Sequence, residues 1–410
     1  MNDDDRVGPR LLVLSALFPN AKQPQGGLFI RERMFRVAER FPVVVVSPKP
    51  WFPLQSLLRR VRPDYRPCPG RHERQGSVDV FFPRFLALPL LGRRFDGFFM
   101  ALGAWGTVRR LQKDGRADLI DAHFAYPDGY AARWLARWLG MPYCVTLRGT
   151  EPRLCRQRAF RRRVLAALAG ATHVIAVANA LREAMVAAGA DGSRITRVGN
   201  GVDVDKFRPL EQGEARAALA VEPDVPVLIS VGGLVPRKGF HRVIRLLPRL
   251  RREFPRIRYL IVGGASPEGN FGGELRSLAA AEGVAEHVDF LGHLPPEQLR
   301  VPLSAADVFV LATENEGWAN VFLEAMACGL PVVTTRVGGN EEVVTDATLG
   351  ALVPPGDTDA LAAAIAAALR KSWSREHLRR HALENQWADR VDDLAAIFQR
   401  LPAPDRSGAR

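Results

Sequence analysis

Apolar runs and amphipathic segments alternate along most of the 410-residue chain. In the first half, apolar runs at 10–18, 42–48 and 142–150 are separated by segments at 27–41 and 129–140, where apolar residues recur every three or four positions. This succession is typical of parallel strands joined by helices. The first half is therefore predicted to form a parallel sheet flanked by helices.

After a connector at 205–219 the same alternation restarts. Further strands are predicted at 225–233, 257–264, 287–294, 307–313 and 330–335. The predicted fold class is α/β, with two Rossmann-like, doubly wound domains that face a central cleft. The expected parts are an N-terminal domain at 1–205, a C-terminal domain at 206–375, and a C-terminal helix and tail at 376–410.

Two segments depart from this alternation. Residues 51–116 are rich in Pro and Arg and are predicted to be less regular. Residues 373–400 are predicted to be helical. The apolar residues there are spaced to share one helix face, and they are Trp387, Val391, Leu394 and Phe398.

The composition is that of a soluble globular protein. No uncharged stretch is long enough to span a bilayer, and the N-terminus lacks a signal-peptide pattern. The protein is therefore expected to stay in the cytoplasm. Four scattered cysteines without a CxxC pair predict reduced thiols rather than a disulfide or zinc framework. They are Cys68, Cys144, Cys155 and Cys328.

The net charge of +13 is distributed unevenly. Residues 1–200 contain 33 Lys and Arg and 16 Asp and Glu, which gives them a net charge of +17. Residues 201–410 contain 24 Lys and Arg and 28 Asp and Glu, which gives them a net charge of −4. A basic half indicates an anionic partner, such as nucleic acid, an anionic membrane surface or a phosphate-bearing substrate. Solvated arginines that reflect only compositional bias are the alternative interpretation.

The segment SVGGLVPRKGF at 230–240 follows a predicted strand and opens a helix. Gly232 and Gly233 allow a tight turn and close approach of a ligand. Backbone N–H groups at a helix start favour an anion, to which Lys238 adds a full positive charge. The order of residues excludes a Walker loop. A surface lysine before a helix is the alternative.

Two glutamates stand seven residues apart in ENEGWANVFLEAMACGLPVVTT at 314–335. Glu316 is expected in the loop after the strand at 307–313, and Gly317 lets the chain turn into a helix at about 319–327. Glu324 lies two turns into that helix among apolar neighbours. Because carboxylates accept hydrogen bonds from sugar hydroxyls, both residues are expected to face a polar ligand.

This glutamate block resembles the signature of the retaining glycosyltransferases of family 4, which have the GT-B fold. The pattern is closest to enzymes that build surface polysaccharides. Smaller matching pieces are GGLFIRERM at 26–34, DAHFAYPDG at 121–129, TLRGTE at 146–151, GNGVDVDKFRP at 199–209, VPRKG at 235–239 and VDFLGHL at 288–294. The resemblance also implies that the C-terminal helix crosses back to the first domain.

The resemblance implies a site for a nucleotide-sugar donor. Lys238 would bind the diphosphate, Glu316 the sugar hydroxyls, and Glu324 the ribose. Backbone groups near the sugar, phosphate and nucleobase would come from two further loops and from glycine turns. These residues are Gly26, Gly27, Gly233, Gly292, Leu294, Ala319, Asn320 and Val321.

On the acceptor side, the resemblance places His123 near the reacting sugar. Glu316, His123 and Lys238 are thus the expected catalytic residues. Many relatives have Gly-Arg where this chain has Gly232-Gly233, and Arg237 is the candidate replacement for the second phosphate-binding cation. A familiar His-Gly pair is here Arg148-Gly149, followed by Glu151, so these two charged residues are the candidate acceptor contacts.

The expected reaction is transfer of a sugar from a UDP- or GDP-sugar to a hydroxyl of a glycan or lipid-linked saccharide. No metal or other cofactor is predicted, because no His, Asp or Cys cluster has ligand spacing. Peripheral association with an anionic membrane surface is expected. A sugar-nucleotide epimerase of the same architecture is the alternative. A nucleic-acid binder is disfavoured because no zinc-finger, RRM or KH signature is present.

Overall fold

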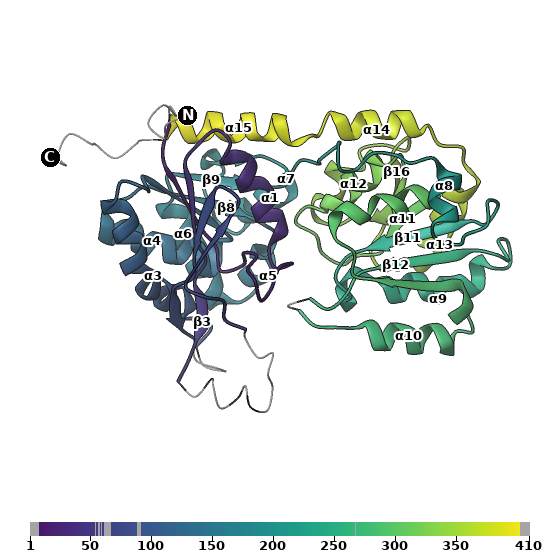
Figure 1. The fold of residues 1–410 in the computed structure, drawn as a ribbon, viewed down its shortest axis with the longest axis horizontal. Helices are drawn as coiled ribbons and strands as arrows, with labels where there is room; N and C mark the ends of the chain where they lie inside the picture. Colours follow the sequence, from purple (N-terminus) through teal and green to yellow (C-terminus); the bar gives the residue numbers. More distant parts are fainter. Residues whose placement is uncertain are drawn as a thin grey trace. The chain divides into compact units, whose positions relative to one another are not determined.

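The computed structural model describes residues 8–53, 55, 58, 60, 67–87, 92–266 and 268–401. The chain divides into two compact units. The described residues of Met1–Gly199 and Arg390–Arg410 form the first unit, and Asn200–Asp389 form the second. Each unit contains its own parallel sheet with helices packed on it (Figure 1). The domain boundaries expected after residues 205 and 375 stay predictions.

The first unit is built on an eight-stranded sheet with the order β10-β9-β8-β7-β1-β2-β5-β4. All neighbouring strands are parallel except β4 and β5. The central strands β1, β7 and β8 are buried along their whole length, as expected for strands covered on both faces. The strands are β1 (Leu11–Leu14), β2 (Val43–Val46), β4 (His72–Gln75), β5 (Val78–Phe81), β7 (Leu119–His123), β8 (Tyr143–Leu147), β9 (His173–Ala176) and β10 (Ile195–Arg197).

Helices join most of these strands, and a second, two-stranded sheet pairs β3 (Lys49–Trp51) with β6 (Arg84–Leu86). The helices of the first unit are α1 (Leu28–Val37), α3 (Asp96–Lys113), α4 (Tyr130–Leu139), α5 (Glu151–Cys155), α6 (Arg158–Gly170) and α7 (Asn179–Ala187), with short helical turns η2 (Ala125–Gly129) and η3 (Gly192–Arg194).

Helix α3 lies in the segment predicted to be less regular, and that prediction is wrong for these residues. Three glycines in the helix weaken its intrinsic helical preference. One of them, Gly103, is required by packing, because an added Cβ would lie 2.4 Å from the Arg84 carbonyl oxygen and 2.8 Å from the Phe85 Cβ. The glycine therefore lets α3 approach β6 closely, which residue propensity alone does not reveal.

The C-terminal helix α15 (Trp387–Arg400) completes the core of the first unit. Its buried residues Val391, Leu394 and Phe398 pack in the same cluster as Phe41. The Phe398 and Phe41 rings meet edge to face with centroids 6.2 Å apart. The predicted return of the terminal helix to the first domain is confirmed. The tail is two helices rather than one, because α14 (Arg375–Leu383) ends before α15 begins.

The second unit has a six-stranded, fully parallel sheet with the order β13-β12-β11-β14-β15-β16. The order reverses between β11 and β14, so the carboxyl ends of these two strands form the switch point where doubly wound sheets bind ligands. The strands are β11 (Val227–Val231), β12 (Arg258–Val262), β13 (Val288–Gly292), β14 (Val308–Leu311), β15 (Val332–Thr335) and β16 (Gly350–Val353).

The helices of the second unit follow the predicted alternation. Besides α14 they are α8 (Gln212–Ala217), α9 (Phe240–Leu250), α10 (Gly272–Ala281), α11 (Arg300–Ala305), α12 (Asn320–Ala327) and α13 (Thr358–Arg370), with short turns η4 (Pro236–Lys238), η5 (Ala285–His287), η6 (Pro296–Gln298) and η7 (Gly338–Glu342). The prediction of two Rossmann-like α/β domains is confirmed. In the described part of the chain no helix is long and apolar enough to cross a membrane.

Candidate functional site

The β11–α9 loop and the loop after β14 meet at the switch point of the second unit. Gly239 makes this possible, because it has φ +78° and an added Cβ would lie 1.9 Å from the Ala312 carbonyl oxygen. The backbone N–H of Glu314 also donates to the Arg237 carbonyl oxygen at 2.8 Å. The turn η4 is thereby held against the end of β14, and Lys238 faces the loop that carries Glu316.

Lys238 and Glu316 form a close ion pair. The Lys238 Nζ lies 2.6 Å from Glu316 Oε1, and the Thr313 hydroxyl donates to the same oxygen at 3.1 Å. Glu316 is 9% exposed, so its carboxylate is partly removed from water and held in one orientation. An ammonium beside a carboxylate offers a cation for a phosphate and an acceptor for a hydroxyl within one small site.

Arg237 also lies near the Glu316 carboxylate. Its Nη1 lies 3.8 Å from Glu316 Oε1, while its Nε and Nη2 donate to the Glu268 carboxylate at 2.8 and 2.6 Å. The hydrogen bond to Glu268 raises the pKa of Arg237. The guanidinium is therefore charged and oriented by a carboxylate that the sequence analysis did not single out. Its role as a second phosphate-binding cation stays a prediction.

Helix α12 begins directly after this loop. Asn320 and Glu324 are both half-buried and stand four residues apart, so they share one helix face, whereas Phe322, Leu323 and Met326 are buried in the unit. The Asn320 side chain accepts a hydrogen bond from the Asn200 side chain at 2.9 Å. The predicted helix at 319–327 is confirmed. Asn200, which the sequence indicated only as a turn residue, is a neighbour of the site.

The remaining candidate residues of the second unit lie at loops of the same sheet edge. Gly233 follows β11 and packs against Ser266. A Cβ added at Gly233 would lie 3.0 Å from the Ser266 Cβ. Gly292 ends β13 with φ +73°, and it is exposed, as expected for a backbone open to a ligand. Leu294 is half-buried two residues later. Their contacts with a donor stay predictions.

In the first unit, Gly26 and Gly27 precede α1. Gly27 has φ +81°, and an added Cβ would lie 2.4 Å from the Leu17 carbonyl oxygen, so only glycine fits there without moving the loop after β1. Helix α1 therefore starts tightly against that loop, and its first backbone N–H groups stand at the carboxyl edge of the sheet.

His123 ends β7 and is completely buried. Arg148 donates a hydrogen bond from Nη2 to His123 Nδ1 at 2.8 Å. The other ring nitrogen, His123 Nε2, lies 3.2 Å from Asp121 Oδ2. A donor at Nδ1 requires a lone pair there, so the proton is on Nε2 and is donated to Asp121. Burial, together with a smaller effect of the nearby Arg148, lowers the pKa of His123 to about 4, although Asp121 acts in the opposite direction.

The residues around His123 form a buried polar network. Burial raises the pKa of Asp121, but its interactions with His123, Arg33 and Thr146 together outweigh this effect and hold the pKa below its ordinary value. The Thr146 hydroxyl donates to Asp121 Oδ1 at 3.0 Å. Asp121 was missed by the sequence analysis, although residues two apart on a strand share a face, so its position two residues before His123 was a usable signal.

Glu151 binds backbone groups in the first unit. Its carboxylate accepts hydrogen bonds from the Ala125 and Gly149 N–H groups at 3.1 and 2.8 Å, and burial raises its pKa. The side chain thereby fixes the loops after β7 and β8. Arg148 stacks over the Phe29 ring at the start of α1, 5.4 Å from its centroid. Direct acceptor contacts of Arg148 and Glu151 stay predictions, as does the cleft expected between the two domains.

Two family models match consecutive parts of the chain. "Glycosyltransferase Family 4" covers residues 37–206, and "Glycosyl transferases group 1" covers residues 211–385. A GDP-mannose-dependent alpha-(1-6)-phosphatidylinositol monomannoside mannosyltransferase of Mycolicibacterium smegmatis is 39% identical over 213 residues, which are 48% of this chain and 54% of that protein. The chain spans about half the length of the curated relatives it matches.

Solved structures of low sequence identity share the fold. A sucrose-phosphate synthase from Thermosynechococcus elongatus has a TM-score of 0.78 at 23% identity, covering 95% of this chain and 98% of that one. Anabaena HepE in complex with UDP and glucose has a TM-score of 0.70 at 20% identity, covering 94% and 98%.

The two parallel-sheet units and the family matches together define a GT-B type glycosyltransferase. Within that class, the chain belongs to glycosyltransferase family 4. The predicted resemblance to family 4 is confirmed at the level of the family, whereas the glutamate signature and the retaining mechanism stay predictions.

Proposed function

We propose that the protein transfers a sugar from a UDP- or GDP-sugar to a hydroxyl of a glycan or lipid-linked saccharide. The observation that carries the proposal is the Lys238–Glu316 pair at the switch point, at 2.6 Å. A relative named for GDP-mannose and a phosphatidylinositol mannoside, and a structural neighbour that holds UDP and glucose, support a nucleotide donor and a saccharide acceptor.

In this proposal the donor lies along the carboxyl edge of the second sheet. Lys238 neutralises the diphosphate, and Glu316 accepts hydrogen bonds from sugar hydroxyls. Glu324 binds the ribose from the face of α12 that it shares with Asn320. Gly292 and the two residues after it lie against the nucleobase. The hydrogen bonds of Glu316 with Lys238 and Thr313 orient these groups before the donor arrives.

The proposed reaction retains the anomeric configuration and needs no metal ion. Lys238, with Arg237 beside it, supplies positive charge for the departing diphosphate. Glu316 is assigned to hydroxyl binding rather than attack, so front-face substitution is favoured, in which the leaving phosphate takes the acceptor proton. Both ring nitrogens of His123 are engaged, so this residue acts by positioning Arg148 rather than by transferring a proton.

Donor binding is tested by thermal unfolding with GDP-mannose, UDP-glucose and the free nucleoside diphosphates. The true donor adds about 2.7 kcal/mol of stability when its free concentration is about 100 times Kd. Lys238→Ala removes this stabilisation and costs roughly 2–4 kcal/mol in transition-state stabilisation, measured as kcat/KM. Lys371→Ala, which removes the lysine that directly follows α13, is the matched control.

The same variant separates the competing interpretations. Unchanged turnover of Lys238→Ala with the identified donor would refute the assignment of the site. Interconversion of nucleotide sugars without any acceptor would identify an epimerase instead. Loss of activity with EDTA, restored by a divalent ion, would overturn metal independence, and an inverted product by NMR would overturn retention.

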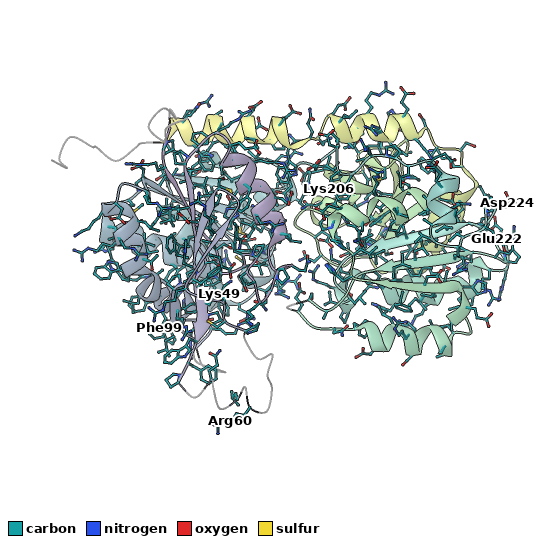
Figure 2. All side chains as sticks on the ribbon, viewed as in Figure 1. Lys49, Arg60, Phe99, Lys206, Glu222 and Asp224 are labelled. Atoms are coloured by element: carbon teal, nitrogen blue, oxygen red, sulfur yellow. The ribbon has the colours of Figure 1, made fainter. Side chains whose placement is uncertain are left out.

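We further propose that the first unit meets an anionic membrane. Helix α3 carries an outward-facing apolar row with helical spacing, next to exposed basic residues. Four side chains form this row, and three of them, Phe95, Leu102 and Trp105, are 39–49% exposed. Arg94 lies over the Phe95 ring and Arg109 over the Trp105 ring. This "α3 stripe" consists of Phe95, Phe99, Leu102 and Trp105, with Phe99 labelled in Figure 2.

The α3 stripe suits the interface of a bilayer. Aromatic and aliphatic side chains enter the boundary of the acyl chains, while arginines beside them contact anionic headgroups. This partner agrees with the high positive charge of residues 1–200 and with an acceptor attached to a lipid. Association of this kind is peripheral and sensitive to salt.

A further inference from the structure

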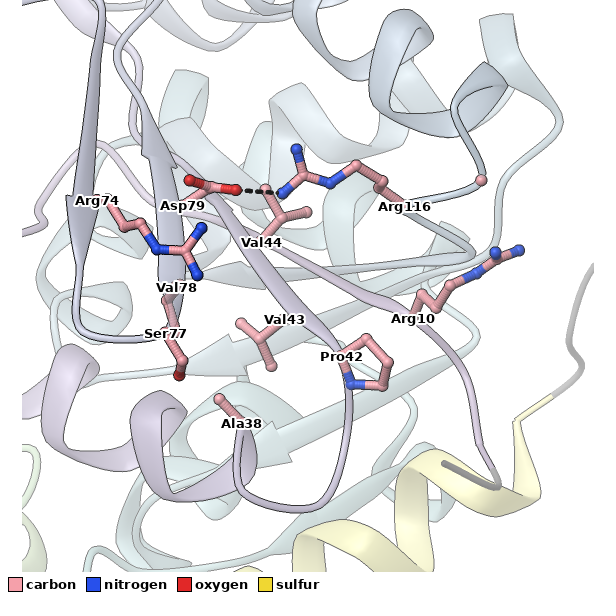
Figure 3. Close-up of a pocket in the computed structure, with 11 residues that line it drawn as sticks. Arg10, Ala38, Pro42, Val43, Val44, Arg74, Ser77, Val78, Asp79 and Arg116 are labelled. Carbon is pink, nitrogen blue, oxygen red and sulfur yellow. Dashed lines mark hydrogen bonds and ion pairs between the residues drawn. The ribbon is translucent and has the colours of Figure 1, made fainter. Parts of the chain in front are cut away.

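The first unit has a pocket at the edge of its sheet opposite to His123. It has a volume of about 420 Å³ and lies where β1, β2 and β5 begin (Figure 3). Arg10, Pro42 and Ser77 directly precede these three strands and line the pocket. His123, in contrast, is the last residue of β7. The pocket is therefore separate from the carboxyl edge where the proposed reaction takes place.

Three guanidinium groups and one carboxylate line the pocket. Arg10 comes from the segment before β1, Arg74 from β4 and Arg116 from the segment after α3, and they surround the pocket together with Asp79 and Ser77 (Figure 3). The rest of the lining is largely apolar and includes Val43 and Val78. A pocket of this size with a few charged groups beside apolar residues is a candidate small-molecule site.

The acidic groups at the pocket already have cationic partners. Asp79 accepts hydrogen bonds from Arg116 and, at 2.9 Å, from His72. Behind the lining, Asp118 accepts from Arg10 Nε and Nη2 at 2.9 and 3.0 Å. These pairs hold Arg10 and Arg116 in place, and they leave the pocket with an excess of positive charge.

Arg74 supplies this excess. It stands opposite Asp79 in the antiparallel register of β4 and β5, yet among the residues that the structure describes its side chain has no hydrogen bond or ion pair. Figure 3 draws its guanidinium at the pocket beside Ser77 and Val78. A guanidinium with its donors available binds phosphate oxygens in a forked geometry, and the Ser77 hydroxyl adds a further donor.

Glycine at position 115 keeps the rim of the pocket open. Gly115 lines the pocket with φ +66°, and an added Cβ would lie 2.9 Å from Arg10 Nη1. A larger residue there would press on the guanidinium and fill space at the rim. The rim therefore combines an oriented arginine with room for a ligand atom.

We propose that this pocket binds the phosphomonoester group of a small organic molecule, with Arg74 and Arg116 on the phosphate and the apolar residues under its organic part. A phosphomonoester carries close to two negative charges at neutral pH and several acceptor oxygens. It can therefore accept hydrogen bonds from Arg74, Arg116 and Ser77 at once, which a single carboxylate with two oxygens does less well. The site is independent of the proposed donor site.

The test is calorimetric titration of the full chain with phenyl phosphate, which joins a phosphomonoester to an apolar ring, and with inorganic phosphate. Phenyl phosphate is expected to bind more tightly than inorganic phosphate. Arg74→Ala is expected to weaken it about tenfold or more, as for a lost charge-assisted hydrogen bond. Arg71→Ala, an exposed arginine near Arg74 that does not line the pocket, should bind like the wild type.

Lys238→Ala distinguishes this site from the proposed donor site. Binding that persists in Lys238→Ala and is lost in Arg74→Ala supports the pocket. Binding that disappears in Lys238→Ala, equal affinity of Arg74→Ala and wild type, or no binding at millimolar concentration would each overturn the proposal. Equal thermal unfolding of Arg74→Ala and wild type shows that the fold is intact.

The phosphomonoester could belong to a soluble molecule or to a lipid headgroup. Sedimentation with phosphatidate-containing vesicles, compared between wild type and Arg74→Ala in the presence of phenyl phosphate, tells the two sources apart. Competition by phenyl phosphate together with weaker vesicle binding of Arg74→Ala identifies a lipid headgroup. If neither phenyl phosphate nor Arg74→Ala affects vesicle binding, while Arg74→Ala weakens the binding of phenyl phosphate, the ligand is a soluble phosphomonoester.

Discussion

At the scale of single residues, Asp128 and Lys49 hold the loop after β1 from inside the first unit. Asp128 accepts a hydrogen bond from the Ala16 N–H, and Lys49 Nζ donates to the Ala16 carbonyl oxygen at 2.9 Å. Burial raises the pKa of Asp128 to about 7 and lowers the pKa of Lys49, which Figure 2 labels, to about 8. Because Gly27 packs on the same loop, these two side chains also support the start of α1.

The raised pKa of Asp128 predicts a specific pH dependence of stability. Between its unfolded value near 3.8 and the folded value of about 7, the folded chain keeps the proton that the unfolded chain releases. The contribution of Asp128 is therefore fully present below about pH 4 and is lost as the pH rises towards 7, with a slope of at most about 1.4 kcal/mol per pH unit.

Asp128→Asn removes this titration but keeps an oxygen for the Ala16 N–H. The free energy of unfolding of both proteins is measured by urea unfolding between pH 4 and 7. As the pH rises, the value for the wild type should fall relative to the value for Asp128→Asn. The lowered pKa of His123 acts in both proteins and cancels in the difference. A difference that does not change with pH would show that Asp128 is ionised throughout.

At the scale of elements, the turn between η4 and α9 links the fold of the second unit to its candidate site. Gly239→Ala would place a Cβ against the Ala312 carbonyl oxygen at a backbone angle that suits glycine. We expect it to push Lys238 away from Glu316 and to abolish stabilisation by the donor, measured by thermal unfolding.

Gly283→Ala is the matched control for this change. Gly283 has φ +66° and an added Cβ would meet nothing within 4 Å, so alanine there costs only the left-handed conformation, about 1–2 kcal/mol. Gly239→Ala should lose more free energy of unfolding than this control, and the control should still respond to the donor. Equal losses in both variants would contradict the close approach.

The sequence predicted most elements because their patterns are local. The strand runs, the helix at 319–327 and the buried face of the tail follow from residue periodicity alone. Helix α3 was missed because it contains three glycines, of which Gly103 serves a contact with β6. The break between α14 and α15 lies within a continuous helical pattern. At the site, Glu316 and Lys238 were identified by type and position, whereas Glu268 joins them through a contact 31 positions from Arg237 along the chain.

At the scale of the whole molecule, the charge asymmetry and the α3 stripe concern the same unit. Vesicle sedimentation should show binding to anionic but not neutral lipid, weakening as salt increases, with each basic residue near the surface contributing about 1 kcal/mol. Leu102→Asp places a charge in the stripe and should reduce binding. Leu383→Asp, at an exposed leucine of the second unit, should leave it unchanged.

Two outcomes would argue against this membrane contact. Equal binding to neutral and anionic vesicles would mean that the arginines only interact with water. Equal binding of Leu102→Asp and wild type would place the contact elsewhere on the protein. In either case transfer to a soluble saccharide should still proceed, because the stripe lies outside the proposed donor site.

The position of α15 also has a consequence for biosynthesis. The core of the first unit uses Phe398, which the ribosome adds almost four hundred residues after the first strand. Until then Phe41 and its neighbours lack their partner from α15, although all strands of the first unit have already been synthesised. The nascent first unit therefore exposes an apolar surface throughout synthesis of the second, which is the period when a chaperone would be most useful to this protein.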